Sequence, residues 1–329
     1  MGTGALALVL STEAQTWNAN WLNNASIVGL ILATALGVIL APRYLRRLRD
    51  RLALMKEIAN PTAGPMLATL PAGLLVLSAA WGRIGPQLLS TSMSLWIASM
   101  LLAIGTILVV GFSLTWSLAI MQANVQMNDI HGGWLIPPVM NLLIPVALAP
   151  IIAVNTPLSE LLLLIGFAFY GLGFLLFLGM FSLFVGRMVL GSPFVGPLAT
   201  GLWIPLAPAG LIGLGAIRLQ QSAVATDLAW LQVPSAFGVI ASAVGLGFGL
   251  WWSLYAFVAF RGIRKTGTAP VQPGWWGVVF PIGALTLSTA VLGQTTNAAA
   301  IEVLGVVGAV LLTACWVVVA KVTFAPAKS

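Results

Sequence analysis

The sequence predicts an all-α integral membrane protein with ten transmembrane helices. Of its 329 residues, 60% are hydrophobic and only 6% are charged, whereas charged residues make up about 25% of soluble domains. The mean hydropathy is +1.04. A spanning helix needs about 20 apolar residues, and polar interruptions divide this chain into nine segments of that size and a shorter first one. Residues 1–329 are therefore expected to form a single transmembrane domain.

The ten apolar segments are expected at 1–10, 26–41, 63–81, 92–120, 134–153, 158–186, 198–217, 234–260, 274–293 and 298–320. The first has no basic residue before it, so it does not have the pattern of a signal peptide. As a helix it would reach about 15 Å, half of the hydrocarbon thickness. The sequence therefore predicts that the natural first helix extends upstream of Met1, truncated here at its N-terminus.

Basic residues separate the two sides of the membrane. All except Arg83 and Arg218 lie in loops after even-numbered segments or in the C-terminal tail: Arg43, Arg46, Arg47, Arg49, Arg51, Lys56, Arg187, Arg261, Arg264, Lys265, Lys321 and Lys328. Short cytoplasmic loops carry such an excess. A multi-pass protein of the plasma (inner) membrane with both termini cytoplasmic is therefore expected. The basic residues flank spans, so they do not predict nucleic-acid binding; the run from Arg43 to Lys56 is either solvated or bound to anionic lipid.

Prolines recur inside the odd-numbered segments and avoid the interior of the even ones. Pro71, Pro138 and Pro205 are separated by 67 residues each, and Pro281 follows 76 residues after Pro205; Pro145 is an alternative match in segment five. A proline inside a helix costs about 3 kcal/mol, and broken backbone is tolerated in membranes where it faces protein or a water-filled cavity. The repeat predicts hairpins whose odd, kinked helices line a central pathway while the even helices face lipid. Purely structural kinks are the alternative.

The side chains of this pathway favour an anion. No ionisable residue falls in the middle of an expected segment, which disfavours cation and proton sites. Arg83 and Arg218 lie near the outer ends of pathway helices, where they would attract anions or only extend their charges into the interface. Six polar residues on odd helices are candidate pathway donors or packing contacts: Thr3, Thr69, Asn141, Thr200, Thr286 and Ser288.

Enzyme chemistry is poorly supported. The chain has one histidine, His131, in a short loop, and one cysteine, Cys315, so no disulfide, metal site or cofactor is expected. Its aspartates are isolated in sequence, whereas a diphosphate-using enzyme would cluster them around Mg²⁺.

Five stretches resemble the tellurite-resistance/dicarboxylate transporter family: "MGTG" at the start, "NPTAGPMLATLPAGLLVLSAAWG" from Asn60, "WLIPPVMNLLIPVA" from Trp134, "GLWIPLAPAG" from Gly201 and "WWGVVFPIGALTLSTA" from Trp275. That family includes bacterial tellurite-resistance proteins, fungal malate permeases and sulfite pumps, and plant slow anion channels. The resemblance implies five helical hairpins in quasi-fivefold arrangement, a homotrimer with one pore per subunit, and Phe280 as the residue that closes the pore. It implies transport of malate-like dicarboxylates or inorganic anions, with sulfite or tellurite-linked anion export as the alternative.

Overall fold

The computed structural model describes residues 1–154, 157–226, 233–234, 236–265 and 273–324, and these residues form helices joined by short turns, without a strand. Asp227 and Lys328 lie outside the described residues. The helices are α1 (Gly2–Thr16), α2 (Asn20–Arg49), α3 (Arg51–Ile58), α4 (Thr69–Ile84), α5 (Thr91–Gln122), α6 (Ile136–Ile152), α7 (Ser159–Leu190), α8 (Leu206–Thr226), α9 (Ala236–Lys265), α10 (Trp276–Thr296) and α11 (Ala299–Phe324). Nine helices of the described part are long and apolar enough to cross a membrane, which confirms a multi-pass membrane protein.

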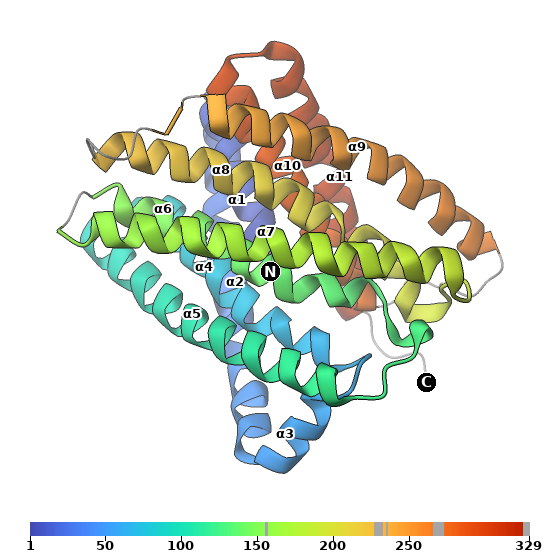
Figure 1. Cartoon of the computed structure of the whole chain (residues 1–329). Coiled ribbons are helices and arrows are strands. Elements are labelled where there is room, and N and C mark those ends of the chain that lie inside the picture. Colours follow the sequence, from blue (N-terminus) through green and yellow to red (C-terminus); the bar gives the residue numbers. More distant parts are fainter. Residues whose placement is uncertain (155–156, 227–232, 235, 266–272, 325–329) are drawn as a thin grey trace.

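Helices that follow one another along the chain pack in pairs: α1 with α2, α4 with α5, α6 with α7, α8 with α9 and α10 with α11 (Figure 1). The first helix of each pair also contacts its counterparts in neighbouring pairs. α1 contacts α4, α4 contacts α6, α6 contacts α8, α8 contacts α10, and α10 returns to α1. The contacts of these five helices, which we call the inner helices, therefore form a closed ring.

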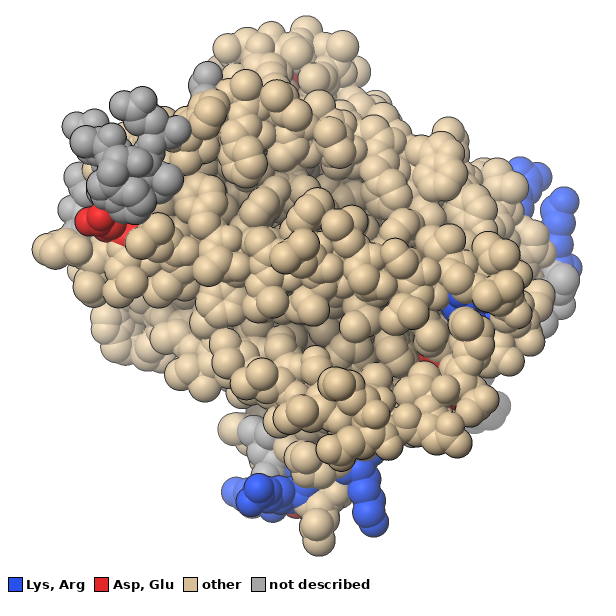
Figure 2. Space-filling view, viewed as in Figure 1, with Lys and Arg blue, Asp and Glu red and all other residues tan. Residues whose placement is uncertain are grey.

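Burial separates the inner helices from the outer ones. Buried residues make up 83% of the apolar stretch in α6, α8 and α10 and 56% in α4, but 28% or less in α2, α5, α7, α9 and α11. Large apolar side chains such as Trp96, Ile107 and Leu254 are exposed on the outer helices. Figure 2 shows a broad face with few charged side chains, and Lys and Arg gathered at its edges, near α3 and near the end of α9. An apolar exposed surface of this size is expected to face lipid.

Only some of the predicted proline positions lie inside α-helices. Pro145 and Pro281 are internal to α6 and α10. Pro71 and Pro138 are each the third residue of an α-helix that directly follows a 3₁₀ turn, and Pro205 precedes α8. A proline in the first helical turn gives up an N–H that would have no helical partner. Of these five prolines, only Pro145 and Pro281 therefore lie in a helix interior, where a proline removes a helical hydrogen bond.

The first helix is longer than the sequence suggested. α1 continues to Thr16, six residues beyond the expected end at residue 10, and places Glu13 in a buried position with 3% of its surface exposed. Arg218, expected beyond segment seven, is well inside α8. Glu13 and Arg218, which follow the ends of the expected segments, thus lie inside helices.

Candidate functional site

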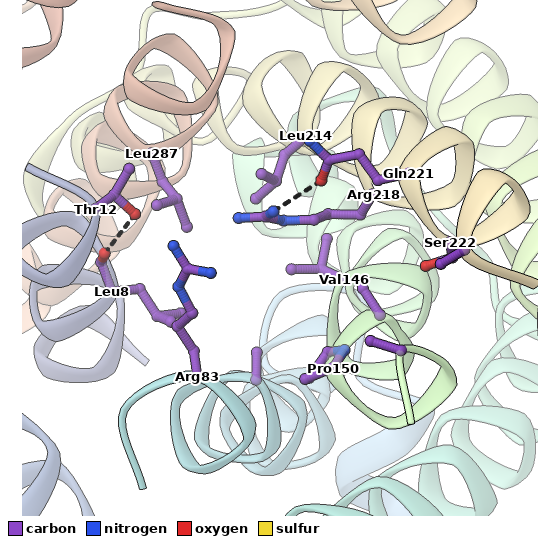
Figure 3. A pocket seen from close by; sticks show the side chains of 14 residues that line it. Leu8, Thr12, Arg83, Val146, Pro150, Leu214, Arg218, Gln221, Ser222 and Leu287 are labelled. Atoms are coloured by element: carbon purple, nitrogen blue, oxygen red, sulfur yellow. Dashed lines mark hydrogen bonds between the residues drawn. The ribbon is translucent and has the colours of Figure 1, made fainter. Parts of the chain in front are cut away.

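A cavity of about 190 Å³ lies within the ring of inner helices (Figure 3). All five contribute to it: Leu8 and Thr12 from α1, Ala79 and Arg83 from α4, Val146 and Pro150 from α6, Leu214, Arg218, Gln221 and Ser222 from α8, and Leu287 from α10. We call it the arginine cavity. It is found toward the C-terminal ends of the inner helices, because Thr12, Arg83, Pro150 and Ser222 all lie in the second half of their helices.

Arg83 and Arg218 extend into this cavity from different helices, and their guanidinium groups point toward one another (Figure 3). Arg218 Nη1 donates a hydrogen bond of 2.9 Å to Oε1 of Gln221, and Arg83 donates to the side-chain oxygen of Gln15. Both acceptors are neutral amides, which orient a guanidinium without cancelling its charge. Among the described residues neither arginine forms an ion pair with a carboxylate. The cavity therefore carries two positive charges with no fixed counter-charge.

A second cavity, of about 20 Å³, adjoins the first and has an entirely apolar lining. The two share Leu8, Ala79, Val146, Leu214 and Leu287, so they are neighbours inside the ring. The smaller one is completed by Ala5, Val76, Leu143, Leu211, Phe280 and Ala284. We call it the apolar constriction. A cavity this small and apolar has no room for a hydrated ion.

Phe280, expected from the resemblance to close a pore, belongs to the lining of the apolar constriction. It directly precedes Pro281 in α10 and is 7% exposed. Three residues after Phe280, α10 comes so close to α1 that a Cβ added to Gly283 would lie 2.9 Å from the Cβ of Ala5. α10 therefore packs closely against α1 near Phe280.

The six polar residues predicted for the pathway do not line either cavity in the described part of the chain. Thr3 joins α1 to α11, whereas Asn141 and Thr69 bond to carbonyl groups three or four residues before them in the chain. Trp316 Nε1 donates to Thr3 Oγ1 at 3.1 Å, Asn141 Nδ2 donates to the Pro137 carbonyl at 2.9 Å, and Thr69 Oγ1 donates to the Met66 carbonyl at 2.7 Å. Thr200, Thr286 and Ser288 are buried. Their role as pathway donors stays a prediction.

Sequence reasoning missed the polar residues that do line the arginine cavity. Gln221 and Ser222 lie three and four residues after Arg218, the spacing that brings side chains to one face of a helix. This spacing from Arg218 could have identified both residues as neighbours of its side chain from the sequence alone. Thr12 was missed because the first segment was ended at residue 10, before the polar residues of α1 begin.

His131 lies away from these cavities, in the turn before α6. It is 1% exposed; its Nδ1 accepts from the Gly133 N–H at 3.0 Å, and its Nε2 lies 3.0 Å from the Thr62 carbonyl oxygen, to which it donates. Burial lowers the pKa of His131 below its usual value, although the Thr62 hydrogen bond and Asp129 act in the opposite direction. The neutral imidazole therefore ties the turn before α6 to the turn before α4. No group of His, Cys, Asp and Glu in the described residues could hold a metal ion.

Comparison with known proteins shows the family to which this chain belongs. The SLAC1 family model, described as voltage-dependent anion channel, matches residues 1–324. An uncharacterised transporter of Methanocaldococcus jannaschii is 27% identical over 270 residues, covering 82% of this chain and 74% of the relative. Proteins named sulfite efflux pumps are similar as well: that of Arthroderma otae is 24% identical over 98% of this chain and 87% of its own length, and that of Trichophyton rubrum is 22% identical over 81% and 72%. The chain belongs to the SLAC1 family of membrane anion channels and transporters.

Proposed function

We propose that this protein moves small anions across the plasma membrane along the line that joins the arginine cavity to the apolar constriction. One observation carries the proposal. Arg83 and Arg218 present two positive charges that no acidic residue of the described chain pairs with, beside a closed apolar cavity lined by all five inner helices. Unpaired guanidinium groups in a partly dehydrated cavity attract anions and repel cations.

The proposed architecture is ten membrane-spanning helices as five hairpins around a quasi-fivefold axis, with α1 as the first inner helix and kinks at Pro145 and Pro281. We place both termini in the cytoplasm, on the distribution of basic residues. The inner helices then begin on the cytoplasmic side and end outside, so the arginine cavity faces outward. Each subunit has its own pathway, and we expect the subunits to assemble as a homotrimer.

Phe280 is the proposed gate. Its aromatic ring is part of the apolar constriction, which at about 20 Å³ is too small for a hydrated anion. Opening requires the aromatic side chain of Phe280 to move out of the apolar constriction. The missing helical hydrogen bond at Pro281 makes α10 easier to bend at this point. Conduction would follow a bend in α10 that widens the passage without disturbing the arginine cavity.

The proposed substrates are malate-like dicarboxylates or inorganic anions. The guanidinium fork matches the paired oxygens of carboxylate and oxyanion groups. Sulfite is the second candidate, because two of the similar proteins are named sulfite efflux pumps. We propose transport rather than catalysis, since the two cavities contain no carboxylate, histidine or thiol among their lining residues.

An anion-replacement conductance series on purified protein in a planar bilayer tests this function. Chloride, nitrate, sulfite and malate are compared at equal ionic strength, and the reversal potential reports which ions pass. We expect anion-selective current with oxyanions among the permeant species. Cation-selective current, or no current and no anion exchange in proteoliposomes, would contradict the proposal.

A further inference from the structure

Glu13 is a buried carboxyl group that the proposed pathway does not use. It lies in α1 with 3% of its surface exposed, on the side of the helix away from the arginine cavity. Oε2 accepts a hydrogen bond of 2.9 Å from Trp17 Nε1, whereas Oε1 is buried and has no hydrogen-bond partner among the described residues. A Cβ added to Gly305 would lie 2.8 Å from Oε1, which places this oxygen against α11.

The charges around Glu13 disfavour an ionised carboxylate. From α11 it is faced by Glu302, a second acid. From α10 comes Gln294, whose amide donates to the Thr12 carbonyl at 2.9 Å and to Thr16 Oγ1 at 2.8 Å, not to Glu13. On α4, Arg83 donates its hydrogen bond to Gln15, and the basic residues of α2 begin only at Arg43. Within the described part of the chain, no salt bridge compensates the charge of Glu13.

We propose that Glu13 is a proton-binding site, which holds a proton in the structure described here and releases it to the outer side when the external pH rises. An unpaired carboxylate in an apolar site loses its hydration without compensation, and a like charge nearby adds to the cost. A neutral acid avoids both costs. Ionisable groups buried inside membrane proteins usually serve a function of this kind.

The position of Glu13 links this proton to anion entry. Thr12, the preceding residue, lines the arginine cavity, and Gln15, two residues later, accepts the hydrogen bond of Arg83. Ionisation would bring two negative charges face to face between α1 and α11, and their repulsion would move the end of α1. It would also place a negative charge one residue from the cavity that gathers anions. Deprotonation of Glu13 is therefore expected to weaken anion uptake from outside.

Infrared difference spectroscopy on the purified full chain tests the proton directly and needs no transport. The C=O stretch of a protonated carboxylic acid should be present at neutral pH in the wild type and absent in Glu13→Gln. The same band in Glu302→Gln would remain. A band that persists in Glu13→Gln, or a wild type without it at neutral pH, overturns the assignment.

Proteoliposome uptake with a fixed internal pH tests the link to transport, and only this arm rests on the proposed function. Between about pH 5 and pH 9 outside, a range that covers buried carboxyl groups, uptake at low anion concentration should fall severalfold in the wild type. Glu13→Gln should keep the acid-side rate at every pH. Removing the Trp17 donor in Trp17→Phe should move the midpoint to higher pH, and removing the like charge in Glu302→Gln should move it to lower pH.

The outcomes separate the two proposals. Anion uptake that is present but independent of external pH, or equally pH-dependent in Glu13→Gln, overturns the proton link and leaves anion transport standing. No uptake at any pH counts against the proposed transport function, while the infrared result still decides whether Glu13 binds a proton. If Glu13→Gln does not fold, the opposite shifts expected for Trp17→Phe and Glu302→Gln decide the link.

Discussion

Arg83 on α4 and Arg218 on α8 reach into the same cavity from different hairpins, and each is oriented by a glutamine and not by a carboxylate. They are close enough for their charges to repel. Two like charges in a partly buried cavity are unfavourable without a counter-ion. An anion from solution would supply that counter-charge, and this relationship is the basis of the first prediction.

Charge reversal at either arginine should impair anion flux. We expect Arg83→Glu and Arg218→Glu each to lower flux by about tenfold, equivalent to about 1.4 kcal/mol of lost anion stabilisation. The loss should be larger at low ionic strength, where screening is weak. Tracer uptake in proteoliposomes at two salt concentrations measures both effects. Arg51→Glu, at an exposed position on α3, is the control; a similar loss in this variant would argue against a specific role for the cavity.

Shortening Phe280 should open the passage. We expect Phe280→Ala to raise basal anion conductance severalfold, and Phe280→Leu to raise it less, because leucine still fills part of the apolar constriction. Single-channel or macroscopic current in planar bilayers measures this, with protein yield and oligomeric state recorded. Phe248→Ala, in the aromatic cluster between α7 and α9, is the matched control and should leave conductance unchanged. Normal folding of Phe280→Ala without added current would mean that Phe280 only packs.

Acidification should destabilise the turn that contains His131. Its pKa is lowered in the folded protein, so the unfolded chain binds more protons below about pH 6.5. The stabilising contribution is complete above that pH and is lost as the pH falls toward the folded pKa. Protonation would place a hydrogen on Nδ1, which accepts from the Gly133 N–H.

Thermal unfolding in detergent between about pH 7.5 and pH 5 measures the His131 effect. We expect the midpoint of the wild type to fall more than that of His131→Asn, whose side-chain oxygen can still accept from Gly133. Equal pH dependence in both proteins would show that His131 does not set it.

A methyl group at Gly210 should separate two inner helices. A Cβ there would lie 2.4 Å from the Ala284 carbonyl oxygen of α10, and neighbouring backbone cannot move aside easily. We expect Gly210→Ala to lower the free energy of unfolding by about 1–3 kcal/mol. Gly247→Ala is the matched control, since nothing lies within 4 Å of the added Cβ, and it should be neutral or stabilise the helix by up to about 1 kcal/mol. Thermal unfolding of both variants gives the comparison; equal stabilities would mean that α8 and α10 are less tightly packed than described.

The sequence by itself determined the membrane class and most helix positions, because apolar segments long enough to span a bilayer are a local property of the chain. It also singled out Phe280 and the two arginines that the structure brings to the cavities. It could not end α1 correctly: Ser11, Thr12 and Glu13 are polar in sequence, but contacts from other helices bury them.

The tertiary structure alone decided which polar residues face the axis. Thr3 and Asn141 have polar groups suited to a pathway, yet Thr3 Oγ1 accepts a hydrogen bond from Trp316 on α11, and Asn141 Nδ2 donates one to Pro137 one turn back. Arg83 and Arg218 are 135 residues apart in the chain, and only the ring contacts that connect α4 to α8 through α6 place them in one cavity. Local hydropathy records whether a residue enters the membrane. The direction in which its side chain points depends on the rotation of each helix against its neighbours, which packing between distant segments determines.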